Sequence, residues 1–262
     1  MIGSTVRAAP HWRVVDFISD LHLQTSERAT FDAWQHYMAQ TPADALFILG
    51  DLFEVWVGDD ITATPGDSES AFAQQCQHII KTVSERLPVY FMHGNRDFLL
   101  GPEFARACGM TLLPDPTVLD FDGQRWLLSH GDELCLGDTD YQQFRQQVRS
   151  EAWRQAFLAI PLPERQAIAK DLRTQSDARK VSGASDADVD SAMALGWLEA
   201  TQASNLIHGH THKPGEHVLN ELNERTMRRL VLSDWDANTA PPRLEVLRLQ
   251  TGTSPKRVPL SD

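Results

Sequence analysis

Five short and mostly apolar runs are each followed directly by side chains that can bind a cation. The runs are residues 14–18, 45–49, 89–92, 126–128 and 205–207. Apolar runs of this length, bounded by glycine and polar residues, are typical of strands covered on both faces. Because open α/β sheets bind ligands at the carboxyl ends of their strands, we predict that the residues after these runs form one site.

The segments between these runs have the spacing of helices. Residues 27–40 place Phe31, Trp34 and Met38 on one face, which predicts an amphipathic helix. Further predicted elements are helices at 69–87 and 103–108, a hairpin that turns at 122–123, and closing strands at 228–232 and 244–249. We therefore predict an α/β core of residues 1–136 and 205–262, with a helical insertion at 137–204.

Composition limits the class of protein. The chain has 262 residues, of which 42% are hydrophobic, enough for one large core. It has no run of 18 or more apolar residues, and residues 1–11 are predicted to be a short tail, not a signal peptide. The net charge of -12 argues against nucleic acid as a partner. Three separated cysteines argue against a disulfide framework and favour the cytoplasm.

The insertion differs from the rest of the chain in charge. Between Tyr141 and Lys180 it has eight positive and four negative side chains, together with apolar residues such as Trp153, Phe157 and Leu158. A basic, apolar helical segment suits an anionic amphiphile or a membrane surface. The alternative is a helical cap whose apolar face packs on the core and whose charges are solvated.

The candidate metal ligands offer oxygen and imidazole nitrogen without sulfur. They are Asp20, His22, Asp51, Asn95, His130, His210 and His212. This donor set suits Mn²⁺, Fe²⁺ or Zn²⁺, and the carboxylates and amide favour Mn²⁺. Two cations held close together need a carboxylate between them, and Asp51 suits that position. His93 and His208 point elsewhere by strand alternation and are predicted to be structural.

Taken in order, these motifs resemble the signature of the calcineurin-like metallophosphoesterases. The resemblance implies two packed mixed β-sheets flanked by helices, a four-layer sandwich with a helical lid, and two Mn²⁺ ions per chain. Residues 48–54, 93–100 and 207–214 are similar to the branch of the family that cleaves the diphosphate of UDP-2,3-diacylglucosamine in lipid A synthesis. The expected products are UMP and 2,3-diacylglucosamine 1-phosphate, and the expected reaction is attack by a metal-activated hydroxide on the α phosphorus.

The resemblance also implies residue roles. One ion would be held by Asp20, His22, Asp51 and His212, and the other by Asp51, Asn95, His130 and His210. Asn95, Arg96 and His210 would contact substrate and act in catalysis with Asp51. Asp138, Tyr141 and Ser176 match positions that bind the acylated sugar. Lys180 stands where this branch has asparagine, and glycine stands where it has lysine, so Lys180 is a candidate to replace that lysine.

Arg96 departs from the wider family, most of whose members have histidine at this position to assist the leaving group. A phosphate monoester that leaves from a diphosphate is a weak base, because its second pKa lies near 6, and it needs little protonation. An arginine that binds two of its oxygens is more useful, so Arg96 favours a diphosphate substrate. The alternative is that Arg96 only pairs with Asp97.

Three other functions stay open at this point: a phosphodiesterase or nuclease, a hydrolase of soluble nucleotide-sugars, and a non-catalytic scaffold of the same fold. We expect a cytoplasmic monomer that contacts the inner leaflet of the inner membrane peripherally, through its basic insertion. The acyl chains of the substrate would lie between the core and the insertion, near Trp153, Phe157 and Leu158.

Overall fold

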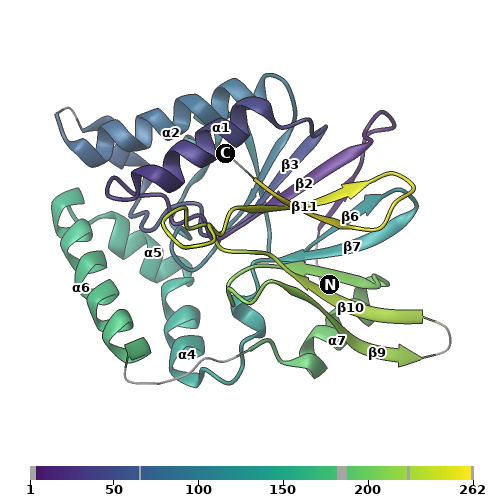
Figure 1. Cartoon of the computed structure of the whole chain (residues 1–262). Helices are drawn as coiled ribbons and strands as arrows, with labels where there is room; N and C mark the ends of the chain where they lie inside the picture. The colour runs from purple at the N-terminus through teal and green to yellow at the C-terminus, as the bar shows by residue number, and fades with distance from the viewer. Residues whose placement is uncertain (1–3, 65, 182–187, 223–224, 261–262) are drawn as a thin grey trace.

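Two mixed β-sheets pack face to face between helices (Figure 1). The computed structural model describes residues 4–64, 66–181, 188–222 and 225–260. In sheet A the strand order is β1 (Ser4–Arg7), β6 (Thr117–Phe121), β7 (Gln124–Ser129), β8 (Asn205–His208), β10 (Arg225–Val231), β9 (Gly215–Leu222). In sheet B it is β12 (Lys256–Pro259), β11 (Glu245–Gln250), β2 (Val14–Ile18), β3 (Ala45–Leu49), β4 (Val89–Met92), β5 (Met110–Leu113).

The alternation of side chains along β3 explains why both of its faces are apolar. Ala45, Phe47 and Leu49 pack in the cluster between the two sheets, whereas Leu46 and Ile48 pack in the cluster under the helices. A strand with two buried faces needs a continuous apolar run, because successive side chains point to opposite faces. All five residues of β3 are accordingly buried.

Helices cover the outer face of each sheet and complete four layers. On sheet B lie α1 (Arg28–Gln40), α2 (Ser68–Ser84) and α3 (Pro102–Cys108), and on sheet A lies α7 (Ser191–Thr201). A short 3₁₀ helix, Asp59–Ala63, precedes α2, and another, Asp132–Leu134, follows β7. The predicted four-layer α/β sandwich is confirmed.

Strand direction brings the predicted ligand loops to one edge. Strands β2, β3 and β4 are parallel to one another, and β7 is parallel to β8. The loops that follow them are joined by backbone hydrogen bonds, from Asp20 N to Gly50 O at 3.1 Å and from Gly209 N to His130 O at 2.9 Å. Between the two sheets, His210 N donates to Asp20 Oδ2 at 2.9 Å, so the carboxyl ends of these strands meet, as the sequence pattern predicts.

The insertion lies beside this edge (Figure 1, left). It contains α4 (Thr139–Val148), α5 (Glu151–Leu158) and α6 (Leu162–Val181), followed by α7. The described residues between 137 and 204 form helices and loops, so the predicted helical character is confirmed. Helix α7 differs from the others because Ala194, Trp197 and Leu198 pack in the core cluster under sheet A.

Four strands were not predicted: β1, β5, β9 and β12. The prediction of a short tail at residues 1–11 is wrong, because Ser4–Arg7 pairs in parallel with β6. Strands β1, β9 and β5 are sheet edges, and so is β12. Edge strands are partly exposed, so they lack the apolar pattern that marks a central strand. Among the described helices, none combines the length and the apolar character needed to cross a membrane.

Candidate metal and catalytic centre

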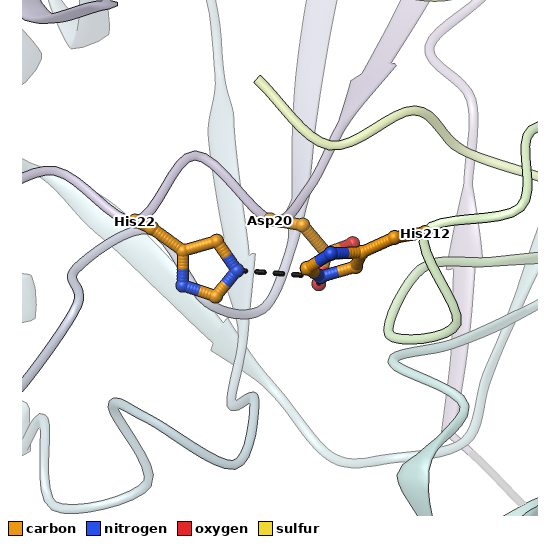
Figure 2. A group of neighbouring side chains, drawn as sticks. All are labelled: Asp20, His22 and His212. Carbon is orange, nitrogen blue, oxygen red and sulfur yellow. Dashed lines mark hydrogen bonds and ion pairs between the residues drawn. The ribbon is translucent and has the colours of Figure 1, made fainter. Parts of the chain in front are cut away.

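Two groups of side chains at this edge have the geometry of metal sites. In each, the ligand atoms lie within 4.8 Å of one another: Asp20, His22 and His212 form the first group, and Asp20, Asp51 and His130 the second. Figure 2 shows the first group, in which His22 and His212 point toward each other with their Nε2 atoms 3.4 Å apart. Carboxylate and imidazole donors packed this closely fit a divalent transition metal.

The backbone at these ligands is strained. Five candidate ligands have left-handed backbone angles: φ is 55° at Asp20, 49° at His22, 52° at Asp51, 67° at His210 and 52° at His212. Only two other non-glycine residues in the described ranges share this conformation. L-residues seldom adopt it, and such strain persists mainly at functional sites, where the surrounding structure enforces it.

Two glycines allow the ligand loops to approach. A Cβ on Gly94 would collide with Asp51, and a Cβ on Gly50 would lie only 2.6 Å from Gly94 Cα. The φ of 89° at Gly50 also favours glycine. The glycines of the Gly-Asp and Gly-Asn pairs are therefore required because the loops after β3 and β4 approach too closely for any larger side chain.

Asp97 joins the same two loops. Its buried carboxylate accepts hydrogen bonds from Leu52 N at 2.8 Å, Gly94 N at 2.8 Å and Asp51 N at 3.3 Å. The ion-pair partner of Arg96 is instead Glu54, with Nη1 and Oε1 4.0 Å apart. The alternative in which Arg96 serves only to pair with Asp97 finds no support among these contacts.

His130, His210 and Asn95 form the other half of the centre. Nδ1 of His130 donates to Leu49 O at 2.9 Å, so Nε2 is the nitrogen that faces the site and whose lone pair a metal would take once its proton has left. The side-chain amide of Asn95 lies 3.1 Å from Nε2 of His130 and 2.8 Å from Nδ1 of His210. Nε2 of His130 is also 3.8 Å from Asp51 Oδ2. These contacts gather the four residues predicted to hold the second ion.

The pKa of His130 shows an excess of negative charge around its ring. Burial opposes protonation of His130, but the carboxylates of Asp51 and Asp20 outweigh it and raise the pKa of this ring to about 9. Burial, reinforced by the charge of His130, lowers the pKa of His210 to about 4. A bound cation would balance the buried carboxylates in place of the proton on His130.

His93 and His208 bind backbone carbonyls. Nε2 of His93 lies 2.6 Å from Leu100 O, and Nδ1 of His208 lies 2.9 Å from Gly209 O. Burial lowers the pKa of each ring to about 4. These contacts agree with the structural role predicted for both residues.

The predicted sugar-binding residues fall on the insertion. Asp138 is the N-cap of α4 and accepts from Tyr141 N at 3.1 Å. The Tyr141 hydroxyl donates to Asp132 at 2.6 Å, and its ring stacks on His210 with centroids 5.9 Å apart. Tyr141 therefore lies at the site. Ser176 and Lys180 lie on α6, but their side chains are outside the described residues.

Sequence reasoning missed the partners of the arginines in the insertion. Arg145 and Arg149 bind the buried carboxylate of Asp132 at 2.8 and 3.2 Å, and Arg149 also donates to Gly94 O at 2.9 Å. Arg165 binds Asp60, and Arg173 binds Glu54 at 2.7 Å. The excess of arginine in the insertion was visible in the sequence, but the acidic partner of each arginine lies outside the insertion and could not be identified from the pattern. These charges tie the insertion to the core and are not merely solvated.

Comparison with known proteins agrees with this geometry. The calcineurin-like phosphoesterase family matches residues 14–214. Proteins named UDP-2,3-diacylglucosamine hydrolase are similar over most of their length. The protein from Xanthomonas campestris pv. campestris (strain B100) is 42% identical over 234 residues, which cover 84% of this chain and 90% of that protein. The protein from Aromatoleum aromaticum is 45% identical over 223 residues, which cover 84% and 88%.

A third relative with the same name, from Shewanella pealeana, is 44% identical over 225 residues, which cover 84% of this chain and 89% of that protein. The family match spans well over half of the chain and includes all seven candidate ligands. The chain belongs to the calcineurin-like phosphoesterase family and, within it, groups with the UDP-2,3-diacylglucosamine hydrolases.

Proposed function

We propose that this chain hydrolyses the diphosphate of UDP-2,3-diacylglucosamine to UMP and 2,3-diacylglucosamine 1-phosphate, a step of lipid A synthesis. The observation that carries the proposal is a pair of carboxylate–histidine groups sharing Asp20, with an arginine in place of the family's usual histidine beside them. Identity of 42% to 45% to proteins named for this substrate supports the same reaction.

Two Mn²⁺ ions are proposed as the cofactor. Asp20, His22, Asp51 and His212 would hold one ion, and Asp51, Asn95, His130 and His210 the other. Ions bound in such a site polarise a phosphoryl group and lower the pKa of a water molecule. Asp20 belongs to both groups of ligand atoms, so its carboxylate and that of Asp51 together offset the repulsion between two cations.

Arg96 would stabilise the leaving group. Its side chain is 14% exposed and lies beside Glu54 at the edge of the site. A guanidinium there can donate two hydrogen bonds to the monoester released from the diphosphate and spread its charge. Cleavage between the two phosphates with attack on the α phosphorus leaves UMP as one product. No general acid is required in this scheme.

Apolar side chains around the insertion would bind the acyl chains. Seven large apolar residues of the described chain are exposed, and six lie on the insertion or next to the ligand loops: Val55, Leu136, Phe144, Leu158, Ile168 and Leu172. We expected Phe157 to contact the acyl chains, but it is only 7% exposed and stacks on Trp153. It therefore packs in the core and is not open to substrate. Leu158 remains a candidate contact.

The same apolar residues are the proposed contact with the inner leaflet of the inner membrane, where a cytoplasmic monomer would collect its substrate. Because Arg145, Arg149 and Arg165 are engaged in ion pairs with the core, the apolar side chains carry more of this proposed contact than the basic charge does. Binding to vesicles with and without anionic lipid would separate the two contributions.

The test is release of UMP, with Mn²⁺ and detergent, from UDP-2,3-diacylglucosamine and from unacylated UDP-N-acetylglucosamine. We expect a strong preference for the acylated substrate. Equal cleavage of both would retain the hydrolase but refute the lipid specificity. No UMP from either substrate, with metal bound, would point to a phosphodiester substrate, and failure to bind metal would point to a scaffold.

A further inference from the structure

A buried carboxylate outside the predicted ligand set lies against three basic side chains. Glu54 is 10% exposed at its side chain. Its Oε2 lies 3.0 Å from His22 Nδ1, and its Oε1 lies 2.7 Å from Arg173 Nη1 and 4.0 Å from Arg96 Nη1. A buried charge is unfavourable unless it is paired, so these partners are what allows a carboxylate here.

The backbone holds Glu54 in this position. Glu54 N donates to Leu23 O at 3.2 Å, and Leu23 N donates to Leu52 O at 2.9 Å, so the loops after β2 and β3 run side by side. Trp56 N donates to Arg96 O at 3.1 Å and brings the third loop alongside. Glu54 therefore faces His22 and Arg96 because three ligand loops are joined by backbone hydrogen bonds.

One oxygen of Glu54 acts on His22. The ring has Nδ1 at Glu54 and Nε2 toward His212, which it approaches at 3.4 Å (Figure 2). A carboxylate next to Nδ1 favours the tautomer with the proton on Nδ1, which leaves the Nε2 lone pair for a metal. Carboxylates placed in this way fix the ring orientation of metal-binding histidines and raise their basicity.

The other oxygen of Glu54 acts on the insertion. Arg173 comes from α6 and reaches the core at Glu54. A second contact of α6 with the core, Arg165 with Asp60, involves no residue of either group of ligand atoms. Among these contacts, the pair of Arg173 with Glu54 is the one that attaches α6 to a side chain in contact with a candidate ligand.

We propose that Glu54 is a positioning residue that orients His22 for the metal and binds α6 to the metal centre through Arg173. This deepens the proposed function and rests on its metal site, but not on the identity of the substrate. The same side chain would then order one ligand, His22, and attach helix α6 of the insertion to the ligand loops.

The experiment compares Glu54→Gln, Arg173→Gln and the control Asp60→Asn, with Mn²⁺ alone and no substrate. Glu54→Gln is expected to weaken Mn²⁺ binding by about 10–100-fold, the range for lost outer partners of metal ligands, and to speed amide hydrogen exchange in α6. Arg173→Gln should speed exchange in α6 while Mn²⁺ affinity stays within about twofold of wild type. Asp60→Asn should likewise leave Mn²⁺ affinity unchanged.

Two outcomes overturn the proposal: unchanged Mn²⁺ affinity in Glu54→Gln, or an equal loss in all three variants. If Glu54→Gln does not fold, the nitrogen NMR signals of His22 in the Zn²⁺-loaded wild-type protein decide. A proton on Nδ1 with Zn²⁺ on Nε2 supports the proposal, and the reverse arrangement refutes it. UMP release by the wild type tests the proposed function separately, so the two failures are distinguishable.

Discussion

At the scale of single residues, the candidate ligands combine backbone strain with buried charge. Left-handed backbone angles at five of them cost about 1–3 kcal/mol each, and they persist because the surrounding structure enforces them. The enforcing contacts are hydrogen bonds such as those from Leu52 N and Gly94 N to Asp97. Stability is thus given up locally to hold carboxylates and imidazoles in one place.

Asp51 is the residue whose loss is expected to affect both proposed ions. In Asp51→Asn, the amide cannot supply the negative charge of the carboxylate. We therefore expect UMP release to fall by more than about 100-fold, which exceeds the effect of losing a residue that only hydrogen-bonds a metal ligand. Steady-state kinetics and metal content should be measured on the same preparation. Full turnover with intact metal content would refute the assignment of Asp51 as the shared ligand.

Metal affinity should depend on pH through His130. Its pKa is raised to about 9 by neighbouring carboxylates, so below pH 9 the metal-free ring carries a proton that must leave before a metal binds. Affinity should therefore rise between about pH 7 and 9 and level off above that range. Titration calorimetry in buffers of different ionisation enthalpy would count the released protons. Binding without proton release at pH 7 would contradict this reading.

At the scale of elements, α4 is attached to the ligand loops by charge. Arg145 and Arg149 share Asp132, which is completely buried two residues after His130. Arg149 also reaches Gly94 O, next to Asn95. The insertion and the loops that hold the candidate ligands therefore belong to one network of ion pairs and hydrogen bonds. The side chain of Arg149 links α4 both to the loop after β7 and to the loop after β4.

Replacing Asp132 should be strongly destabilising. Asp132→Ala leaves two guanidiniums without their buried partner, and breaking a buried pair in this way costs about 3–5 kcal/mol. Urea unfolding monitored by circular dichroism would measure the loss. The matched surface change Asp32→Ala, which removes an exposed pair with Arg28, should shift the free energy of unfolding by less than about 1 kcal/mol. Similar losses in both variants would contradict the role of Asp132.

At the scale of the whole molecule, the site depends on two sheets that pack tightly enough to align their edges. Phe47 lies in the cluster between the sheets and stacks on Phe17 and Tyr90, with centroids 5.3 and 4.6 Å apart. Strands β2, β3 and β4 are kept in register by such contacts. The distances between ligand loops therefore depend on packing between the sheets, well away from the ligands.

Phe47→Ala should destabilise the fold by about 3–5 kcal/mol, because it leaves a cavity between two rigid sheets. Thermal and urea unfolding would measure this loss. Phe47→Leu, which retains most of the volume, should recover the greater part of it. A small effect of the alanine variant would mean that the sheets can collapse onto the cavity, and that their packing constrains the site less than we infer.

The sequence by itself determined the central strands and the candidate ligands, and its resemblance to a known family implied the four-layer class. Strands buried on both faces must be continuously apolar, and functional side chains at their carboxyl ends stand out against them. The edge strands β1, β5, β9 and β12 were decided by pairing with neighbours, since their own residues carry little apolar pattern.

Tertiary structure alone decided the charge partners. The sequence assigned no partner to Glu54, Asp132 or Arg173, and it offered Asp97 only as a possible partner of Arg96. Their partners lie in loops or helices far along the chain, as with Arg173 and Glu54 or Asp97 and Leu52. Sequence periodicity reports which face of an element is apolar, but not which distant charge will meet it. That choice is made when the sheets, loops and insertion pack together.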